Sequence, residues 1–170
     1  MKPYLPRSAV SPKVALGKSK LHGDGVFARE RIPAGETVMV FGGKILTREQ
    51  AQSDDYRVRS IWPVGEDAYL GLPVSDTAIS LDEYLNHSCD ANCWLADEVT
   101  LTAKRAIESG EEITLDQGTW NDDDAYISDG TPCTCGAETC RGFLTLEDWK
   151  RADVRERYRG HFHPLIQRQI

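Results

Sequence analysis

Residues 86–92 read NHSCDAN, a polar run between Leu85 and the strand-like segment 93–95. The run places an amide, an imidazole and a thiol close together along the chain. Thiols and imidazoles are ligands that zinc prefers in proteins, and an asparagine amide both donates and accepts hydrogen bonds. We therefore take this run as the first candidate for a functional segment and look for the groups with which it acts.

Three further cysteines lie near the other end of the chain, where Cys133, Cys135 and Cys140 form a C-x-C-x4-C cluster. Structural zinc takes four ligands, so the cluster leaves one position open, and Cys89 is the natural candidate for it. The odd total of five cysteines favours metal ligands over disulfides. The alternative is a tight loop of unligated thiols. Cys93 is expected to be an ordinary buried thiol.

Length and charge exclude several classes of protein. The 170 residues suffice for one ordinary domain. No apolar run approaches the roughly 18 residues that span a bilayer, and no secretory signal is recognisable, so we expect a soluble, cytoplasmic protein without membrane contact. A net charge of −7 argues against general nucleic-acid binding. It suits a cationic partner, although an acidic surface also serves solubility alone.

Short apolar runs separated by turn residues predict a mostly β structure. We expect strands at 14–19, 25–28, 37–43, 58–62, 68–72, 93–95, 98–107 and 111–115. Helices are expected over 47–56, where Thr47 and Gln50 form a capping box, and over 145–160 with Thr145 as N-cap. The pattern predicts an α+β fold that is mostly β.

Four segments together resemble the SET-domain family of protein lysine methyltransferases. They are HGDGVFA (22–28) followed by IPAGETV, then NHSCDAN (86–92), GEEIT (110–114) and CTCGAETCRG (133–142). Their order and spacing match the family over roughly residues 15–145. The resemblance implies short strands in small curved sheets with a knot-like C-terminal region, followed by a zinc-bound post-SET loop and a C-terminal helix.

This resemblance divides the chain into four parts. They are an N-terminal arm over 1–12, the SET domain over 13–120, an acidic loop with the post-SET zinc module over 121–145, and a C-terminal helix and tail over 146–170.

The resemblance implies S-adenosylmethionine as methyl donor, held in a pocket separate from a narrow lysine channel, and one structural zinc ion. The implied zinc ligands are Cys89, Cys133, Cys135 and Cys140. The implied cofactor-binding residues are Lys20, His22, Gly23, Asp24, Gly25, Val26, Tyr84, Asn86, His87, Phe143 and Leu144. Glycine suits the turn because a missing side chain allows close backbone approach.

The sequence departs from the family pattern at the expected catalytic centre. After GEEIT the family runs aromatic-Asp-Tyr, whereas this chain has Leu115, Asp116 and Gln117. Phe41 stands where many relatives have a second channel tyrosine, and Glu83 stands where an arginine is frequent. Gln117 therefore occupies the position of the catalytic tyrosine.

Other side chains are candidates to compensate for the missing tyrosine. The Gln117 amide oxygen is able to accept a hydrogen bond from a lysine amine, Tyr126 or Tyr69 would supply a hydroxyl, and Trp120 would supply an aromatic wall. Each of these aromatic residues is equally compatible with ordinary packing.

Two other polar clusters allow a functional and a plain interpretation. The acidic run Asp122-Asp123-Asp124 is a candidate dock for a basic peptide or simply a solvated loop. His161 and His163, in HFHP, are formally able to bind metal, but we expect them at the surface.

We therefore predict an S-adenosylmethionine-dependent protein lysine N-methyltransferase with an atypical active site, acting on a lysine-containing, basic protein or peptide. The alternatives are a weak or inactive SET module that acts by binding the cofactor or a basic peptide, and a zinc-held structural module.

Overall fold

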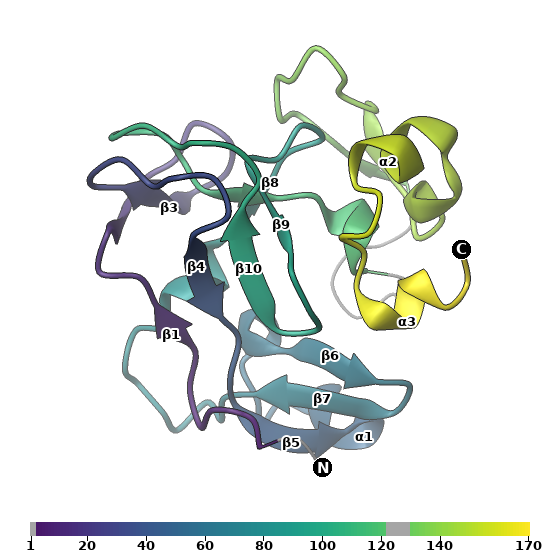
Figure 1. The fold of residues 1–170 in the computed structure, drawn as a ribbon. Coiled ribbons are helices and arrows are strands. Elements are labelled where there is room, and N and C mark those ends of the chain that lie inside the picture. The colour runs from purple at the N-terminus through teal and green to yellow at the C-terminus, as the bar shows by residue number, and fades with distance from the viewer. Residues whose placement is uncertain (1–2, 122–129) are drawn as a thin grey trace.

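The computed structural model describes residues 3–121 and 130–170. The largest sheet has the order β1-β4-β10-β9, in which every pair is antiparallel. Its strands span Ala9–Val10, Thr37–Val40, Thr100–Ala103 and Cys93–Leu95. The N-terminal segment thus adds an edge strand to this sheet. Figure 1 shows this four-stranded sheet in the middle of the molecule.

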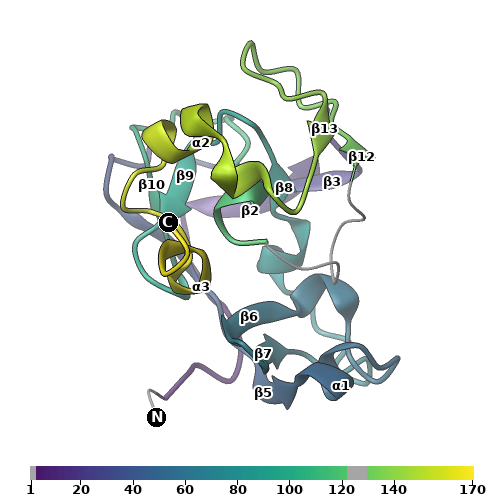
Figure 2. The ribbon, with the colours of Figure 1, turned by 90° about the vertical axis from the view of Figure 1, so that its right-hand side faces the viewer.

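A second antiparallel sheet has the order β5-β7-β6. Its strands span Lys44–Thr47, Ala68–Gly71 and Trp62–Gly65, and the short helix α1 (Arg48–Ala51) follows β5 directly. This sheet and α1 lie at the opposite end of the molecule from β12 and β13 (Figure 2).

Three pairs of strands complete the described part of the fold. The antiparallel pairs are β2 with β3 (Val14–Lys18 and Asp24–Ala28) and β12 with β13 (Thr131–Pro132 and Phe143–Leu144). The third pair, β8 with β11 (Asn86–His87 and Thr114–Leu115), is parallel. This parallel pair brings the two most distinctive motifs of the sequence side by side.

The larger hydrophobic core combines side chains of the four-stranded sheet, such as the fully buried Leu101, with those of other segments, such as Val26 and Ile113. A smaller cluster, built around Trp149 and Tyr158, attaches the helices α2 (Ala152–Arg157) and α3 (Pro164–Gln167) to the domain. Helices in the described parts of the chain are too short and too polar to cross a membrane. The α+β, mostly β fold expected from the sequence is confirmed.

The strands differ from the prediction in two places. The segment 58–62 is not a strand: Val58–Ser60 form a 3-10 turn, and only Trp62 begins a strand. The Ser60 hydroxyl donates to the Arg57 carbonyl at 2.7 Å and accepts from the Leu72 N–H at 2.8 Å. These local polar contacts compete with strand pairing. The prediction also missed β5.

The predicted helices are shorter than expected. The capping box of Thr47 and Gln50 is present, but α1 ends at Ala51 and buries no residue. Without a buried apolar face, such a short helix has little to extend it.

Thr145 does not cap the C-terminal helix. Its hydroxyl lies 3.1 Å from the Asp148 carboxylate at the start of a 3-10 turn, Asp148–Lys150. Arg151 is extended, with φ −67° and ψ 136°, so α2 begins only at Ala152. The Asp148 carboxylate also accepts from Arg141 at 2.8 Å.

Candidate functional site

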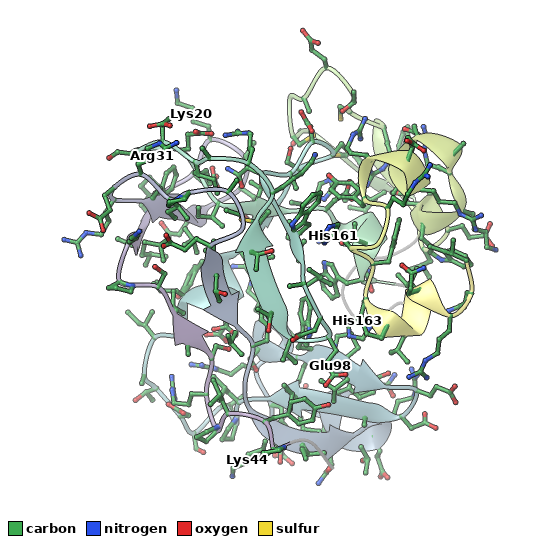
Figure 3. The ribbon with its side chains drawn as sticks, in the orientation of Figure 1. Lys20, Arg31, Lys44, Glu98, His161 and His163 are labelled. Atoms are coloured by element: carbon green, nitrogen blue, oxygen red, sulfur yellow. The ribbon has the colours of Figure 1, made fainter. Side chains whose placement is uncertain are left out.

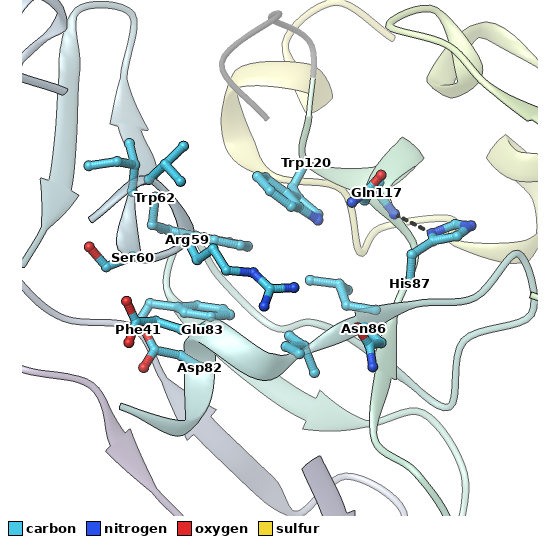
Figure 4. Close-up of a pocket in the computed structure, with 14 residues that line it drawn as sticks. Phe41, Arg59, Ser60, Trp62, Asp82, Glu83, Asn86, His87, Gln117 and Trp120 are labelled. Atoms are coloured by element: carbon cyan, nitrogen blue, oxygen red, sulfur yellow. Dashed lines mark hydrogen bonds between the residues drawn. The ribbon is translucent and has the colours of Figure 1, made fainter. Parts of the chain in front are cut away.

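The parallel pair β8 and β11 is the frame of the candidate site. Asn86 pairs with Thr114, and His87 pairs with Leu115. This register places the end of β11 beside the His87 imidazole, and the Gln117 N–H donates to His87 Nδ1 at 3.1 Å (Figure 4). The two positions that the sequence analysis assigned to cofactor and catalysis are therefore joined by one hydrogen bond.

Asn86 fixes the turn between β2 and β3. Its amide nitrogen lies 3.1 Å from the carbonyl oxygens of both His22 and Asp24, and 2.7 Å from Glu112 Oε1. The other oxygen of Glu112 accepts from the Ser19 hydroxyl at 2.8 Å. The structure thus brings together the predicted turn and Asn86, and it adds Glu112, the second acid of GEEIT, which the sequence analysis did not single out.

Glycine is needed at two positions of this turn for different structural reasons. Gly23 has φ +52°, a backbone conformation that residues other than glycine rarely adopt. Gly25 is required by close packing, because a Cβ atom there would lie 2.3 Å from Glu112 Oε1 and 3.1 Å from the Asn86 amide nitrogen. The contact that excludes a side chain at Gly25 is therefore made by the protein itself.

The remaining turn residues occupy distinct environments. Val26 is fully buried and its carbonyl accepts from the Ile113 N–H at 2.7 Å, so its side chain belongs to the core. Lys20 is exposed (Figure 3) and lines a hollow of about 410 Å³ that also contacts Ser88 and Cys135. This hollow lies between the turn and the cysteine loop.

Asn92, at the end of the NHSCDAN run, holds β11 in place. Its side chain donates to the Glu112 carbonyl at 2.8 Å and accepts from the Thr114 N–H at 2.9 Å. Asn92 is buried. Both asparagines of the run are therefore positioning groups that join loops to the central pair of strands.

A pocket of about 210 Å³ lies beside Asn86 and His87. One wall is a stack of three rings, in which the centroids of Phe41 and Trp62 are 3.8 Å apart and those of Trp62 and Trp120 are 4.6 Å apart. The pocket is lined by Phe41, Val58, Arg59, Ser60, Ile61, Trp62, Asp82, Glu83, Leu85, Asn86, His87, Leu115, Gln117 and Trp120 (Figure 4).

Gln117 contributes a buried polar atom to this pocket. Its Oε1 has no hydrogen-bond partner within residues 3–121 and 130–170. An unpaired buried acceptor costs free energy, so it marks a place where a donor is expected to bind. The predicted position of Trp120 in the wall agrees with the structure, whereas Trp62 and Arg59 were not anticipated because they come from a segment predicted as a plain strand.

The two tyrosines proposed as substitutes have different outcomes. Tyr69 is buried with Leu46 and Ile61 beneath the guanidinium group of Arg48. It does not line the pocket that contains Gln117, so the structure does not support Tyr69 as a source of a hydroxyl there. Tyr126 lies outside the described residues, as does the acidic run Asp122–Asp124.

Three predicted cofactor residues from other segments, Tyr84, Phe143 and Leu144, do not line the pocket that contains Gln117. Leu144 is buried, whereas Phe143 is 59% exposed. Tyr84 is half-buried, and the Arg59 guanidinium lies 6.0 Å from the centroid of its ring.

Three of the four predicted zinc ligands, Cys89, Cys133 and Cys135, lie together, and a ring nitrogen of His87 joins them in a group from which Cys140 is absent. The sulfur atoms of Cys89 and Cys133 are 3.8 Å apart. Zinc–sulfur bonds of about 2.3 Å in a tetrahedron place the sulfurs about 3.8 Å apart. Cys135 accepts from the Cys89 N–H at 3.4 Å. The pKa of the Cys135 thiol is lowered to about 7. Burial acts to raise this pKa, but hydrogen bonds from the N–H groups of Cys89 and Ala137 outweigh that effect.

Both His87 and Cys140 are near enough to be considered as the fourth ligand. The nearest ring nitrogen of His87 and the sulfurs of Cys89, Cys133 and Cys135 lie within 4.8 Å of one another. Because His87 Nδ1 accepts from Gln117, the neutral ring carries its proton on Nε2, which lies 3.3 Å from Cys89 Sγ. Burial lowers the pKa of His87, so this neutral form is favoured.

A protonated Nε2 donates to sulfur and cannot bind zinc. The thiol of Cys140, which interacts with Cys133 and Cys135, is therefore the better fourth ligand. Either set, four thiols or three thiols with an imidazole, is a known donor set for structural zinc.

Of the two histidines of HFHP, which were expected at the surface, His163 is buried and His161 is half-buried. His163 is 1% exposed. The His161 ring stacks on Trp94 with centroids 3.5 Å apart, and its Nδ1 lies 2.9 Å from the Leu95 carbonyl oxygen. Both rings fill the space between the C-terminal segment and the sheet (Figure 3). Cys93 is fully buried, as predicted.

Comparison with known proteins agrees with this arrangement. The sequence pattern of the SET domain family matches residues 23–118. "Histone-lysine N-methyltransferase TRX1" from Oryza sativa subsp. japonica is 32% identical over 78% of this chain and 14% of its own length. "Histone-lysine N-methyltransferase ash1" from Drosophila melanogaster is 31% identical over 81% of this chain and 6% of its own length. The chain thus spans a small part of these relatives.

Solved structures share the fold. A chain of an active polycomb repressive complex 2 in the basal state aligns with a TM-score of 0.50 and 25% identity over 62% of this chain and 15% of its own length. A chain of ctPRC2 in an autoinhibited conformation, bound to S-adenosylmethionine, aligns with a TM-score of 0.52 and 24% identity over 65% of this chain and 15% of its own length. Motifs, fold and family pattern agree, and the chain belongs to the SET-domain family.

Proposed function

We propose that this chain is an S-adenosylmethionine-dependent protein lysine N-methyltransferase in which Gln117 holds the lysine amine. The observation that carries the proposal is the buried Oε1 of Gln117, which lacks a partner among the described residues and lines an aromatic-walled pocket. A lysine amine that enters the pocket is the type of donor that this oxygen requires.

The pocket suits an amine in its neutral form. Lysine in water has a pKa of about 10.4, so its proton must be lost before the nitrogen attacks. The rings of Phe41, Trp62 and Trp120 exclude water from one wall and thereby disfavour the ammonium form. Gln117 Oε1 then orients the nitrogen through a hydrogen bond, and orientation supplies much of the rate of a displacement.

The chain offers a frame for the cofactor, which would supply an electrophilic methyl group. The fit rests on the turn that Asn86 holds beside β8, since the His22 and Asp24 carbonyls are both tied to its side chain. Asn86, His87 and the turn would hold the cofactor against the pocket. The four thiols would hold zinc and keep the cysteine loop against β8.

The substrate class follows from charge and from the relatives. The relatives above are named as histone-lysine methyltransferases, and this chain carries a net charge of −7. An acidic protein attracts a basic partner. A lysine-rich basic protein is therefore the proposed substrate.

A transfer assay with labelled S-adenosylmethionine and purified histones tests the proposal. Gln117→Leu keeps the size of the side chain and removes the acceptor. Loss of one well-placed polar group at a reacting centre costs about 10²–10³ in rate, so this variant is expected to lose transfer while it still binds S-adenosylhomocysteine. Equal transfer by both proteins would show that Gln117 does not hold the amine.

One observation favours a second candidate, a SET module that acts by binding. No tyrosine lies among the described residues that line the pocket, so the usual hydroxyl is missing. In that case the wild-type protein binds S-adenosylhomocysteine without transferring methyl groups, and Gln117→Tyr creates or strongly raises transfer.

A further inference from the structure

The turn that carries Gln117 is anchored at the aspartate that precedes it. Asp116 is the N-cap of the 3-10 turn Gln117–Thr119, and its side chain accepts from the Gly118 N–H at 2.9 Å. The direction of the Asp116 carboxylate therefore fixes the start of this turn, and with it the point from which the Gln117 side chain leaves the backbone. A group that holds this carboxylate also places Gln117.

Arg141 holds the Asp116 carboxylate in one direction. Two nitrogens of its guanidinium group lie 2.8 and 2.7 Å from the two carboxylate oxygens, so the pair is bidentate. The third nitrogen, Nε, donates to Asp148 at 2.8 Å. A guanidinium group whose three nitrogens are all engaged by carboxylates has little freedom to turn, because its donors form a rigid planar fork.

The turn is also packed closely against segments that follow Arg141 in the chain. A Cβ atom at Gly118 would lie 3.0 Å from Asp148 Cβ. The Thr119 carbonyl accepts from the His163 N–H at 2.8 Å. The C-terminal part of the chain thus encloses the turn, and Arg141 contributes the charge that binds Asp116.

Stability alone gives little reason for burying these charges. The side chains of Arg141, Asp116 and Asp148 are 1%, 0% and 4% exposed. Loss of hydration offsets much of the attraction in a buried pair, and apolar residues of similar volume often stabilise a protein equally well. A charged fork adds a direction that apolar contacts lack. Direction matters here because the next residue, Gln117, lines the pocket and has a buried Oε1 without a partner among the described residues.

Resting on the proposed function, we propose that Arg141 is a positioning residue for methyl transfer, which sets the place of the Gln117 amide oxygen through Asp116. Arg141 does not line the pocket that contains Gln117, so it acts on Asp116 and not on the substrate. Its own backbone is fixed by the cysteine loop, because it follows Cys140 and its N–H donates to Cys89 Sγ at 3.4 Å.

A double-mutant cycle of transfer rates separates positioning from general stability. Arg141→Lys keeps the charge without the fork, and Asp116→Asn keeps the shape without the charge, so either variant tests the pair if the other does not fold. Both are measured as zinc-loaded protein with labelled S-adenosylmethionine and purified histones, in the wild-type and Gln117→Leu backgrounds. Asp148→Asn is the matched control, because it weakens the other ion pair of Arg141 and leaves the Asp116 pair in place.

Both variants of the pair are expected to lower kcat. A displacement of about 1 Å costs about 10²-fold in rate, so the smaller tilt expected here should cost about tenfold in kcat, with KM for the histone unchanged. In the Gln117→Leu background the same changes should alter kcat by less than about twofold, because the oxygen that they displace is absent. Asp148→Asn should leave kcat within about twofold of its own background.

Hydrogen exchange supplies a readout that does not depend on transfer. The Gln117 and Gly118 N–H groups donate to His87 Nδ1 and to Asp116 Oδ1, so their exchange rates report on the turn directly. Arg141→Lys is expected to speed this exchange about tenfold, because the turn opens more readily. The control Asp148→Asn should exchange at the wild-type rate.

Two results would overturn the inference while leaving the proposed function intact. One is a wild-type kcat in both Arg141→Lys and Asp116→Asn. The other is a loss by the same factor with and without Gln117, which would make Arg141 a structural residue only. If the folded wild-type protein transfers no methyl groups, the proposed function is wrong, and the exchange of the Gln117 and Gly118 amides decides whether Arg141 places the turn.

Discussion

The Arg141 guanidinium group donates two hydrogen bonds to the Asp116 carboxylate, with nitrogen–oxygen distances of 2.7 and 2.8 Å, and a third to Asp148. Arg141 directly follows Cys140, and Asp116 directly precedes Gln117. The ion pair thus connects the cysteine loop to the residue proposed to hold the amine. The NHSCDAN run makes a second connection, because His87 accepts from the Gln117 N–H while Cys89 contacts Cys133 and Cys135 of the cysteine loop.

Replacing Arg141 is expected to destabilise the protein strongly. The side chains of Arg141, Asp116 and Asp148 are 1%, 0% and 4% exposed, so Arg141→Met leaves two buried carboxylates without their cation. Breaking a buried pair in this way costs about 3–5 kcal/mol, which urea unfolding of the zinc-loaded protein will measure. Arg159→Met, which removes an exposed pair with Glu156, is the control and should change stability by less than about 1 kcal/mol.

Zinc content distinguishes the two candidates for the fourth ligand. Cys140→Ala is expected to lower the zinc retained after dialysis well below one ion per chain, because it removes a thiol ligand. The variant His87→Gln should retain zinc, since the wild-type His87 ring is expected to donate to Cys89 and not to bind metal. Cys93→Ala is the matched cysteine control. Loss of zinc from His87→Gln alone, with Cys140→Ala unaffected, would assign the ligand to His87.

The close packing at Gly25 predicts a measurable coupling with Glu112. Gly25→Ala places a methyl group against the Glu112 carboxylate, and overpacking of this kind costs about 1–3 kcal/mol. In the Glu112→Ala background the cost of Gly25→Ala should be smaller, which a double-mutant cycle of unfolding free energies detects. Additive effects would mean that Glu112 moves aside freely.

Acid should weaken the fold through His163. Burial lowers the pKa of this histidine to about 4, below the value of about 6.5 in an unfolded chain. Above about pH 6.5 the ring is neutral in both states and exerts no pH effect. As pH falls from about 6.5 to 4, only the unfolded chain takes up the proton, so stability decreases.

The expected loss from His163 at pH 5 is about 2 kcal/mol. Other groups titrate in the same range, so the comparison is between wild type and His163→Gln. The free energy of unfolding of wild type should fall by this additional amount between pH 7.5 and pH 5, measured in urea. The same pH dependence in both proteins would show that His163 is readily protonated in the folded state.

The linear sequence was sufficient for features that depend on residue type and order. Short apolar runs with glycine turns predicted most of the strands, and four ordered motifs predicted the family. Cys89 was correctly paired with the distant cysteine cluster, because zinc requires a fourth ligand and few other thiols exist. Gln117 was located by the motif GEEIT, which precedes it at a fixed distance.

Tertiary structure alone decided which side chains meet. Trp62 and Arg59 enter the pocket because a local Ser60 contact replaces the predicted strand with a turn, and Tyr69 is carried away from the pocket by its sheet. His163 is buried because α3 packs back onto the domain. The C-terminal helix starts only at Ala152 because Arg151 is extended, which the residue pattern did not indicate. Residue types and spacing determine which chemistry a chain contains, whereas contacts between segments distant in sequence determine where that chemistry is assembled.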